Sequence, residues 1–199
     1  MRQLLLGTRN VGKTAELKSI LCDIEGLELL TCADRSFSEV AETGETFLEN
    51  ALLKARGILT ETGLPVLAED AGLEVAALAG APGVRSARFA GIPVDYGANN
   101  RLLLERLAEV EDRRARFVTV AALVLPDERV FVTTGVLEGA IGDRPIGEGG
   151  FGYDPLFVPD GESRTLAQLT LDEKNQISHR MRAMRLMLPI LRELSDRPS

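Results

Sequence analysis

The chain opens with a short apolar segment that runs directly into the loop GTRNVGKT at residues 7–14. Residues 2–6 (RQLLL) predict a buried strand, and from Lys13 onward the apolar residues recur at helical spacing. The loop matches the phosphate-loop pattern G-x-x-x-x-G-K-[ST] letter for letter, and it stands between a strand and a helix as that pattern requires. This start restricts the chain to folds in which helices pack on a sheet.

The rest of the chain continues to alternate between strand and helix patterns. The segments expected to be strands are 27–31, 64–70 and 116–141, the last of them a long hairpin. Helices are expected to start after a capping box at Thr46 and Glu49, at residue 97, and at Ser178. The alternation and the hairpin predict an α/β fold with a mixed sheet and flanking helices. The length of 199 residues predicts a single domain over residues 1–199.

Composition narrows the class of protein. The net charge of −7 argues against broad binding to DNA or RNA, which needs a basic surface. The sequence contains no long uncharged apolar run, so we expect a soluble cytoplasmic protein without a membrane span. Cys22 and Cys32 form no C-x-x-C motif and are expected to be reduced thiols.

Lys13 and the glycines of the first loop predict a phosphate-binding turn at a helix N-terminus. A true phosphate loop also needs an aspartate for Mg²⁺ at the end of a second strand. Asp70 and Asp127 are the two candidates, and Asp127 falls in the expected hairpin turn. Glu69 and Asp70 should point to opposite faces of their strand, because successive side chains alternate. We assign the chemistry to Asp70, because the tight turn expected at Gly72 follows it.

Two other groups of residues are open to a structural and a functional interpretation. Glu42 lies ahead of the helix that carries Asn50 and Lys54, so it either complements the helix dipole or belongs to a metal and phosphate cluster. The stretch GGFGYDP at 149–155 is either a tight turn or a loop on which a base stacks. A lone histidine, His179, is more often structural than catalytic.

Taken in order, several motifs resemble the inosine triphosphate pyrophosphatase family. These motifs are TRNVGK at 8–13, FLENALLKA at 47–55, EDAGL at 69–73, GAPGVRSARFAG at 80–91, GGFGYDP at 149–155 and EKNQISHR at 173–180. The resemblance runs from residue 2 to about residue 190. It implies hydrolysis of dITP, ITP and XTP to the monophosphate and pyrophosphate. It also implies a two-lobed fold around a long mixed sheet, with the active site in a central cleft.

Carried over position by position, the resemblance implies a Mg²⁺-dependent homodimer in which Asp70 is the catalytic carboxylate that orients or deprotonates the attacking water, and Glu42 and Asp70 are the metal ligands. The residues that it implies for substrate binding are Thr8, Arg9, Asn10, Val11, Gly12, Lys13, Lys54, Ala71, Phe151, Gly152, Tyr153, Asp154, Lys174, His179 and Arg180. Arg9 stands where the family often has glycine, and Ala71 where it usually has serine. Neither departure removes a charged catalytic group.

Three alternatives remain open at this point. The first is a phosphate-loop kinase or NTPase that acts at the γ-phosphate. The second is a nucleotide sensor without catalysis, although binding alone would not need Glu42 and Asp70. The third is a pyrophosphatase for other modified nucleotides, which shares most of the same features.

Overall fold

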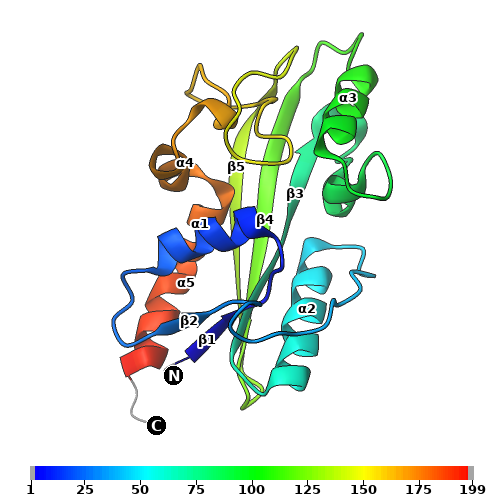
Figure 1. Cartoon of the computed structure of the whole chain (residues 1–199). Helices are drawn as coiled ribbons and strands as arrows, with labels where there is room; N and C mark the ends of the chain where they lie inside the picture. Colours follow the sequence, from blue (N-terminus) through cyan, green and yellow to red (C-terminus); the bar gives the residue numbers. More distant parts are fainter. Residues whose placement is uncertain (1–2, 197–199) are drawn as a thin grey trace. The chain divides into compact units, whose positions relative to one another are not determined.

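The computed structural model describes residues 3–196 and shows an α/β fold (Figure 1). The strands are β1 (Gln3–Leu6), β2 (Glu28–Leu30), β3 (Val66–Val75), β4 (Arg114–Val124), β5 (Val130–Ile141) and β6 (Phe157–Pro159). The α-helices are α1 (Val11–Leu21), α2 (Phe47–Thr62), α3 (Tyr96–Arg106), α4 (Leu171–Ile177) and α5 (His179–Asp196). Three short 3₁₀ helices lie at Ala76–Leu78, Gly83–Arg88 and Leu166–Gln168.

The strands form one sheet of six in the order β2-β1-β3-β4-β5-β6. Strand β1 is parallel to both β2 and β3, whereas β6 is antiparallel to β5. The sheet is therefore mixed, which confirms the predicted fold class. The expected hairpin is also present, because β4 and β5 are neighbours in the sheet and the intervening turn is closed by the Leu125 N–H on the Arg129 carbonyl at 3.0 Å.

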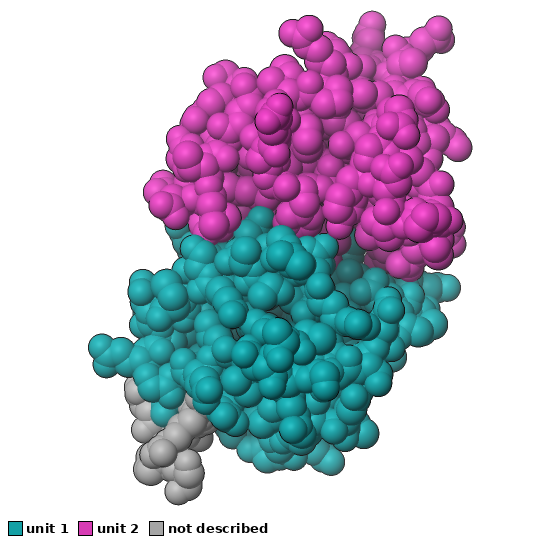
Figure 2. Space-filling view, viewed as in Figure 1, with its two compact units in different colours: residues 1–70, 119–135, 180–199 teal, residues 71–118, 136–179 magenta. Residues whose placement is uncertain are grey.

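The chain divides into two compact units, which Figure 2 shows in different colours. Unit 1 contains the residues up to 70, residues 119–135 and the residues from 180 onward, and unit 2 contains residues 71–118 and 136–179. In unit 1, Leu4 and Leu6 of β1 point to the sheet face that α1 and α5 cover. Each buried leucine on that face stabilises the fold by about 1.5–3 kcal/mol.

Unit 2 has a hydrophobic core of its own. It contains Leu103 of α3 together with Phe117 of β4 and Phe157 of β6, and the two aromatic rings lie 4.8 Å apart between centroids. The loop that follows β5 contributes Tyr153 and Leu156 to the same core. The glycine-dense stretch at 149–155 is therefore tied to the folding of unit 2 by its own side chains.

Two predicted element boundaries were wrong. The strand expected to end at Asp70 continues to Val75, because Leu73 and Val75 extend the buried face beyond Gly72. The last helix continues past Pro189 to Asp196 and is not shortened. Within residues 3–196, none of the helices has the length and the apolar composition that crossing a membrane would require.

Candidate active site

The first loop is short, because α1 already begins at Val11, before Gly12 and Lys13. Asn10 caps the helix, and its Oδ1 accepts a hydrogen bond from the Lys13 N–H at 3.0 Å. The Thr14 hydroxyl donates to the Asn10 carbonyl at 3.0 Å, whereas a phosphate-loop threonine would direct that hydroxyl at Mg²⁺. These contacts favour a capped helix start over a phosphate loop of the NTPase type.

Gly7 has a packing reason to be glycine. A Cβ atom at this position would lie 2.9 Å from the Ala68 Cβ and 3.0 Å from the Val66 Cγ1, closer than real Cβ contacts normally come. The residue therefore allows β1 to pass close to the side chains of β3. Its match to the phosphate-loop pattern is explained without a phosphate.

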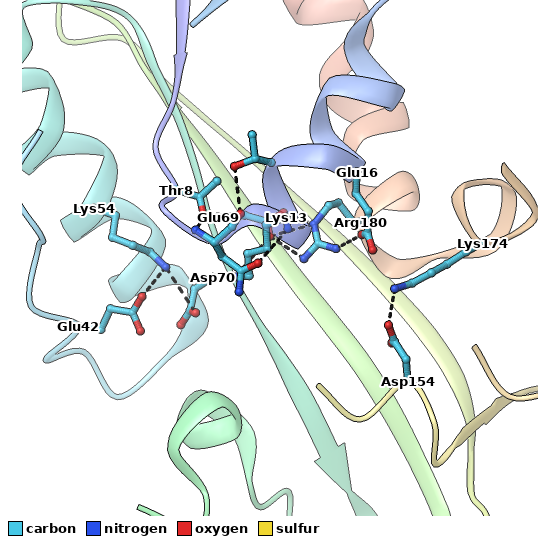
Figure 3. A network of polar contacts seen from close by, with 12 residues as sticks. Thr8, Lys13, Glu16, Glu42, Lys54, Glu69, Asp70, Asp154, Lys174 and Arg180 are labelled. Atoms are coloured by element: carbon cyan, nitrogen blue, oxygen red, sulfur yellow. Dashed lines mark hydrogen bonds and ion pairs between the residues drawn. The ribbon is translucent and has the colours of Figure 1, made fainter. Parts of the chain in front are cut away.

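Lys13 belongs to a buried network of charges in unit 1 (Figure 3). Its Nζ lies 3.4 Å from the Glu69 Oε1. The Arg180 guanidinium donates to Glu69 through Nε at 2.9 Å and through Nη2 at 2.7 Å, and its Nη1 donates to Glu16. Burial lowers the pKa of Lys13, and the positive charges of Lys54 and Arg180 lower it further against the opposing effect of Glu69. One strand carboxylate thus holds cations from α1 and α5.

Arg180 is the most buried member of this network, with 1 % of its surface exposed. Burial disfavours its charged form, but Glu69 and Glu16 outweigh that effect and raise its pKa above the usual value for arginine. The guanidinium is therefore a permanent charge that donates to two carboxylates. This placement indicates a role in positioning Glu69.

The second network lies on the opposite face of β3 and joins Asp70 to α2. The Lys54 Nζ is 2.7 Å from the Glu42 Oε1 and 3.6 Å from the Asp70 Oδ1. Asn50 donates from Nδ2 to the Asp70 Oδ2 at 3.0 Å. Burial raises the pKa of Asp70, the charge of Glu42 adds to this rise, and Lys54, Lys13 and Asn50 oppose it. As expected, Glu69 and Asp70 serve different partners on opposite faces.

Glu42 and Asp70 are a donor set that suits a hard divalent cation. Mg²⁺ prefers oxygen ligands and is commonly held by one or two protein carboxylates together with substrate phosphates. Among residues 3–196, no three His, Cys, Asp or Glu side chains form a group able to hold a metal by themselves. The carboxylates of Glu42 and Asp70 could therefore supply two of the ligands of a metal ion, and a bound polyphosphate would supply others.

In unit 2, Asp154 organises the glycine-rich loop. Its Oδ2 accepts the Phe151 N–H at 2.8 Å and the Lys174 Nζ at 2.5 Å, a pair visible in Figure 3. The Lys174 Nζ also lies 5.0 Å from the centroid of the Phe151 ring. Gly150 has a φ of +71°, and a Cβ there would come within 2.1 Å of the Asp154 Oδ2. The loop conformation thus depends on this glycine and this carboxylate.

Two further contacts fix the same loop. The Asn100 Nδ2 donates to the Gly152 carbonyl at 3.1 Å, and the Tyr153 hydroxyl donates to the Ser86 carbonyl at 2.9 Å. Tyr153 and Asp154 are each only 3 % exposed, whereas Phe151 and Gly152 are partly exposed. Of the four loop residues expected to contact the substrate, Phe151 and Gly152 are therefore the ones at the surface.

The remaining expected site residues lie as follows. Thr8 accepts the Asn10 N–H at 3.2 Å, Arg9 and Val11 are exposed, Gly12 lies in the first turn of α1, and Ala71 follows Asp70 in β3. His179 stacks on Phe117 in unit 2 with ring centroids 4.7 Å apart and planes 10° apart. Its ring is therefore held by packing at the start of α5.

Sequence reasoning missed three residues that the structure places in these networks. Glu16 lies three positions after Lys13, so the two share a helix face, and this spacing is the signal that could have revealed it. Glu69 was set aside in favour of its neighbour, although it holds both Lys13 and Arg180. Asn100 gave no local signal, because its partner Gly152 is 52 positions away.

Comparison with known proteins identifies the group to which this arrangement belongs. The model of the Ham1 family matches residues 4–190. Curated relatives from Streptomyces coelicolor and Mycobacterium tuberculosis, each named dITP/XTP pyrophosphatase, are both 50 % identical and cover 98 % and 97 % of this chain and 99 % and 97 % of their own lengths.

Solved structures agree with this assignment. A Ham1 protein from Coxiella burnetii superimposes with a TM-score of 0.88 at 41 % identity, covering 97 % of this chain and 100 % of that one. A dITP/XTP pyrophosphatase from Mycobacterium abscessus gives 0.75 at 46 % identity, covering 96 % and 100 %. These findings confirm the resemblance noted in the sequence. The chain belongs to the Ham1 family.

Proposed function

We propose that this protein hydrolyses deaminated purine nucleoside triphosphates, dITP, ITP and XTP, to the nucleoside monophosphate and pyrophosphate. The observation that carries the proposal is the Lys54 contact with both Glu42 and Asp70, in a chain that is 50 % identical over almost its full length to proteins named dITP/XTP pyrophosphatase. The cellular role that follows is the removal of these nucleotides from the pool before polymerases use them.

The residues of unit 1 suit the triphosphate. Phosphoanhydride hydrolysis depends mostly on positioning and charge neutralisation, so lysines and a metal suffice without a covalent nucleophile. Lys13 and Lys54 neutralise phosphate charge, and Thr8 and Asn10 shape the turn that joins β1 to α1, the helix that carries Lys13. Both lysines are half-buried, Lys13 contacts Glu69, and Lys54 contacts Glu42 and Asp70, which limits the movement of each ammonium and favours a fixed phosphate geometry.

Glu42 and Asp70 are the residues that would hold Mg²⁺. A bound Mg²⁺ supplies charge neutralisation and makes a coordinated water easier to ionise. Asp70 orients the attacking water and accepts its proton, and burial keeps this carboxylate more basic than an ordinary aspartate. Asn50 holds the other oxygen of Asp70 and so fixes the direction of the acceptor.

The residues of unit 2 suit the base. Phe151 offers a partly exposed ring for stacking. Asp154 accepts the Phe151 backbone N–H and the Lys174 Nζ, and this Nζ lies 5.0 Å from the centroid of the ring, so both residues fix the loop that presents it. His179 of unit 2 and Arg180 of unit 1 are the proposed donors for a 6-keto oxygen, and the Arg180 guanidinium also donates to Glu69 and Glu16. Adenine presents an amino group at this position and would leave buried donors unpaired, at a cost of about 1–3 kcal/mol each. The proposal also includes a homodimer in the cytoplasm that binds neither nucleic acid nor membrane.

A substrate panel tests the reaction. The protein is incubated with Mg²⁺ and dITP, XTP, dATP or dGTP, and the products are separated and identified. We expect pyrophosphate and the monophosphate from dITP and XTP and little turnover of dATP. Orthophosphate with a diphosphate product would instead indicate the γ-phosphate chemistry of a kinase or NTPase. If another modified nucleotide were hydrolysed faster, the proposed substrate would be wrong, but the proposed release of pyrophosphate would still hold.

Tyr153→Phe separates the structural from the binding role of the loop. The hydroxyl donates to the Ser86 carbonyl inside unit 2, so we expect its removal to lower the free energy of unfolding by about 0.5–1.5 kcal/mol. The KM for dITP should stay within about twofold of wild type, because this hydroxyl bonds the protein and not the substrate. Loss of a hydrogen bond to the substrate would raise KM by more than that. Urea unfolding and initial rates measure the two quantities, and a large rise in KM at unchanged stability would contradict this assignment.

A further inference from the structure

Lys54 occupies the space between the two carboxylates assigned to the metal. Its Nζ lies 2.7 Å from the Glu42 Oε1 and 3.6 Å from the Asp70 Oδ1, and its side chain is only 13 % exposed (Figure 3). A lysine whose sole task is to meet phosphate would more simply extend into solvent on its flexible stem. In this structure the Lys54 ammonium instead contacts the carboxylates of Glu42 and Asp70.

An uncharged side chain, Asn50, holds the two carboxylates in position around this ammonium. Asn50, one helical turn before Lys54 on α2, is fully buried and uses both ends of its amide. Its Oδ1 accepts the Gly44 N–H at 2.8 Å, and its Nδ2 donates to the Asp70 Oδ2 at 3.0 Å. A Cβ at Gly44 would lie 2.8 Å from that Oδ1, so the position needs glycine. Asn50 therefore ties the segment that carries Glu42 to Asp70 whatever charge lies between them.

The charge balance then depends on Lys54. With Lys54 the three side chains sum to one negative charge, and without it to two. An opposite charge within about 4–6 Å of a carboxylate changes its affinity for a proton by about 10- to 1000-fold. The same ammonium must weaken the attraction of the pair for any other cation, including a divalent metal.

We propose that Lys54 is the internal counter-ion of the Glu42–Asp70 pair in the nucleotide-free enzyme. It keeps the pair assembled and competes with the divalent cation until a polyphosphate offers the ammonium other anionic partners. This inference rests on the proposed function. It makes metal and triphosphate binding cooperative. The triphosphate draws the ammonium away from the carboxylates, which favours the metal, and the metal replaces the ammonium at the carboxylates, which frees Lys54 for the triphosphate.

The test is a titration of Mn²⁺ into nucleotide-free protein, followed by calorimetry. Lys54→Gln removes the charge and keeps a polar side chain, and we expect it to bind Mn²⁺ at least about tenfold more tightly than wild type. Lys54→Arg keeps the charge and should bind as wild type does. Lys18→Gln is the matched control, because it removes an exposed lysine from α1 and should leave the affinity unchanged.

The stability of the same proteins gives a second measurement. In EDTA, Lys54→Gln should unfold at a lower temperature than wild type, and Mn²⁺ should raise its midpoint by more than it raises that of wild type. Lys54→Met, which keeps the length of the side chain, provides a second uncharged variant if Lys54→Gln does not fold. Unchanged or weaker Mn²⁺ binding in the uncharged variants overturns the inference. Because no nucleotide is present, this result is independent of which triphosphate the enzyme hydrolyses.

Discussion

Asp70→Asn is expected to reduce turnover of dITP by about 10²–10⁴-fold while nucleotide binding persists. The substitution keeps the shape of the side chain and an oxygen that can accept from Asn50, but it removes the negative charge that accepts the proton. Lys54 keeps its contact with Glu42 at 2.7 Å, so a cation still faces the phosphates. Pyrophosphate release measures turnover, and calorimetry with dITP measures binding to the inactive variant.

Asp127→Asn is the control for this experiment. Asp127 also follows an apolar segment, and it pairs with Arg129 at 2.7 Å in the turn between β4 and β5 with its side chain 55 % exposed. Removing this charge should leave turnover unchanged. If Asp70→Asn retains near wild-type rates, the assignment of the acid is wrong, and a loss of turnover in Asp127→Asn would point to the same conclusion.

Arg180→Met should lower the free energy of unfolding by about 3–5 kcal/mol. The guanidinium satisfies Glu69 and Glu16, and its removal leaves two buried carboxylates without it, one of which keeps Lys13 at 3.4 Å. Buried carboxylates without their cation either pay for desolvation or take up protons. Urea unfolding at pH 8 should therefore show the full loss.

Arg192→Met is the matched control on the same helix. Arg192 is exposed, so the same change of side chain should alter stability by no more than about 0.5 kcal/mol. A small loss in both variants would show that the buried network contributes little. Because breaking a buried ion pair and replacing it are different experiments, the result measures the cost of an orphaned partner rather than the net worth of the network.

Local patterns were sufficient for much of the fold. The capping box at Thr46 and Glu49 was predicted from four letters and is present, because both bonds lie within one turn of α2. The hairpin of β4 and β5 was likewise predictable from adjacent residues. The extension of β3 beyond Asp70 was not, because it depends on packing in unit 2 that no local pattern contains.

In the candidate site, too, contacts between nearby residues could be predicted from the sequence, whereas contacts between distant residues could not. The polar face of Asn50 and Lys54 was read from their spacing, and the structure brings both to Asp70. The pairing of Arg180 with Glu69 joins residues 111 positions apart, and its pairing with Glu16 joins residues 164 apart. Single-sequence reasoning assigned Arg180 to the base and missed its two carboxylate partners, because only folding brings Glu69 and Glu16 near it.

The register of β3 against β1 has a consequence for tolerance to mutation. Leu5 pairs with Val66 and Leu6 with Leu67, and this alignment sends Glu69 to one face and Asp70 to the other. A slip by one residue would exchange the two faces and place each acid before the other's lysine. The apolar contacts that lock this alignment, including the close approach at Gly7, therefore act on turnover from a distance. Substitutions in these leucines should therefore reduce turnover as well as stability.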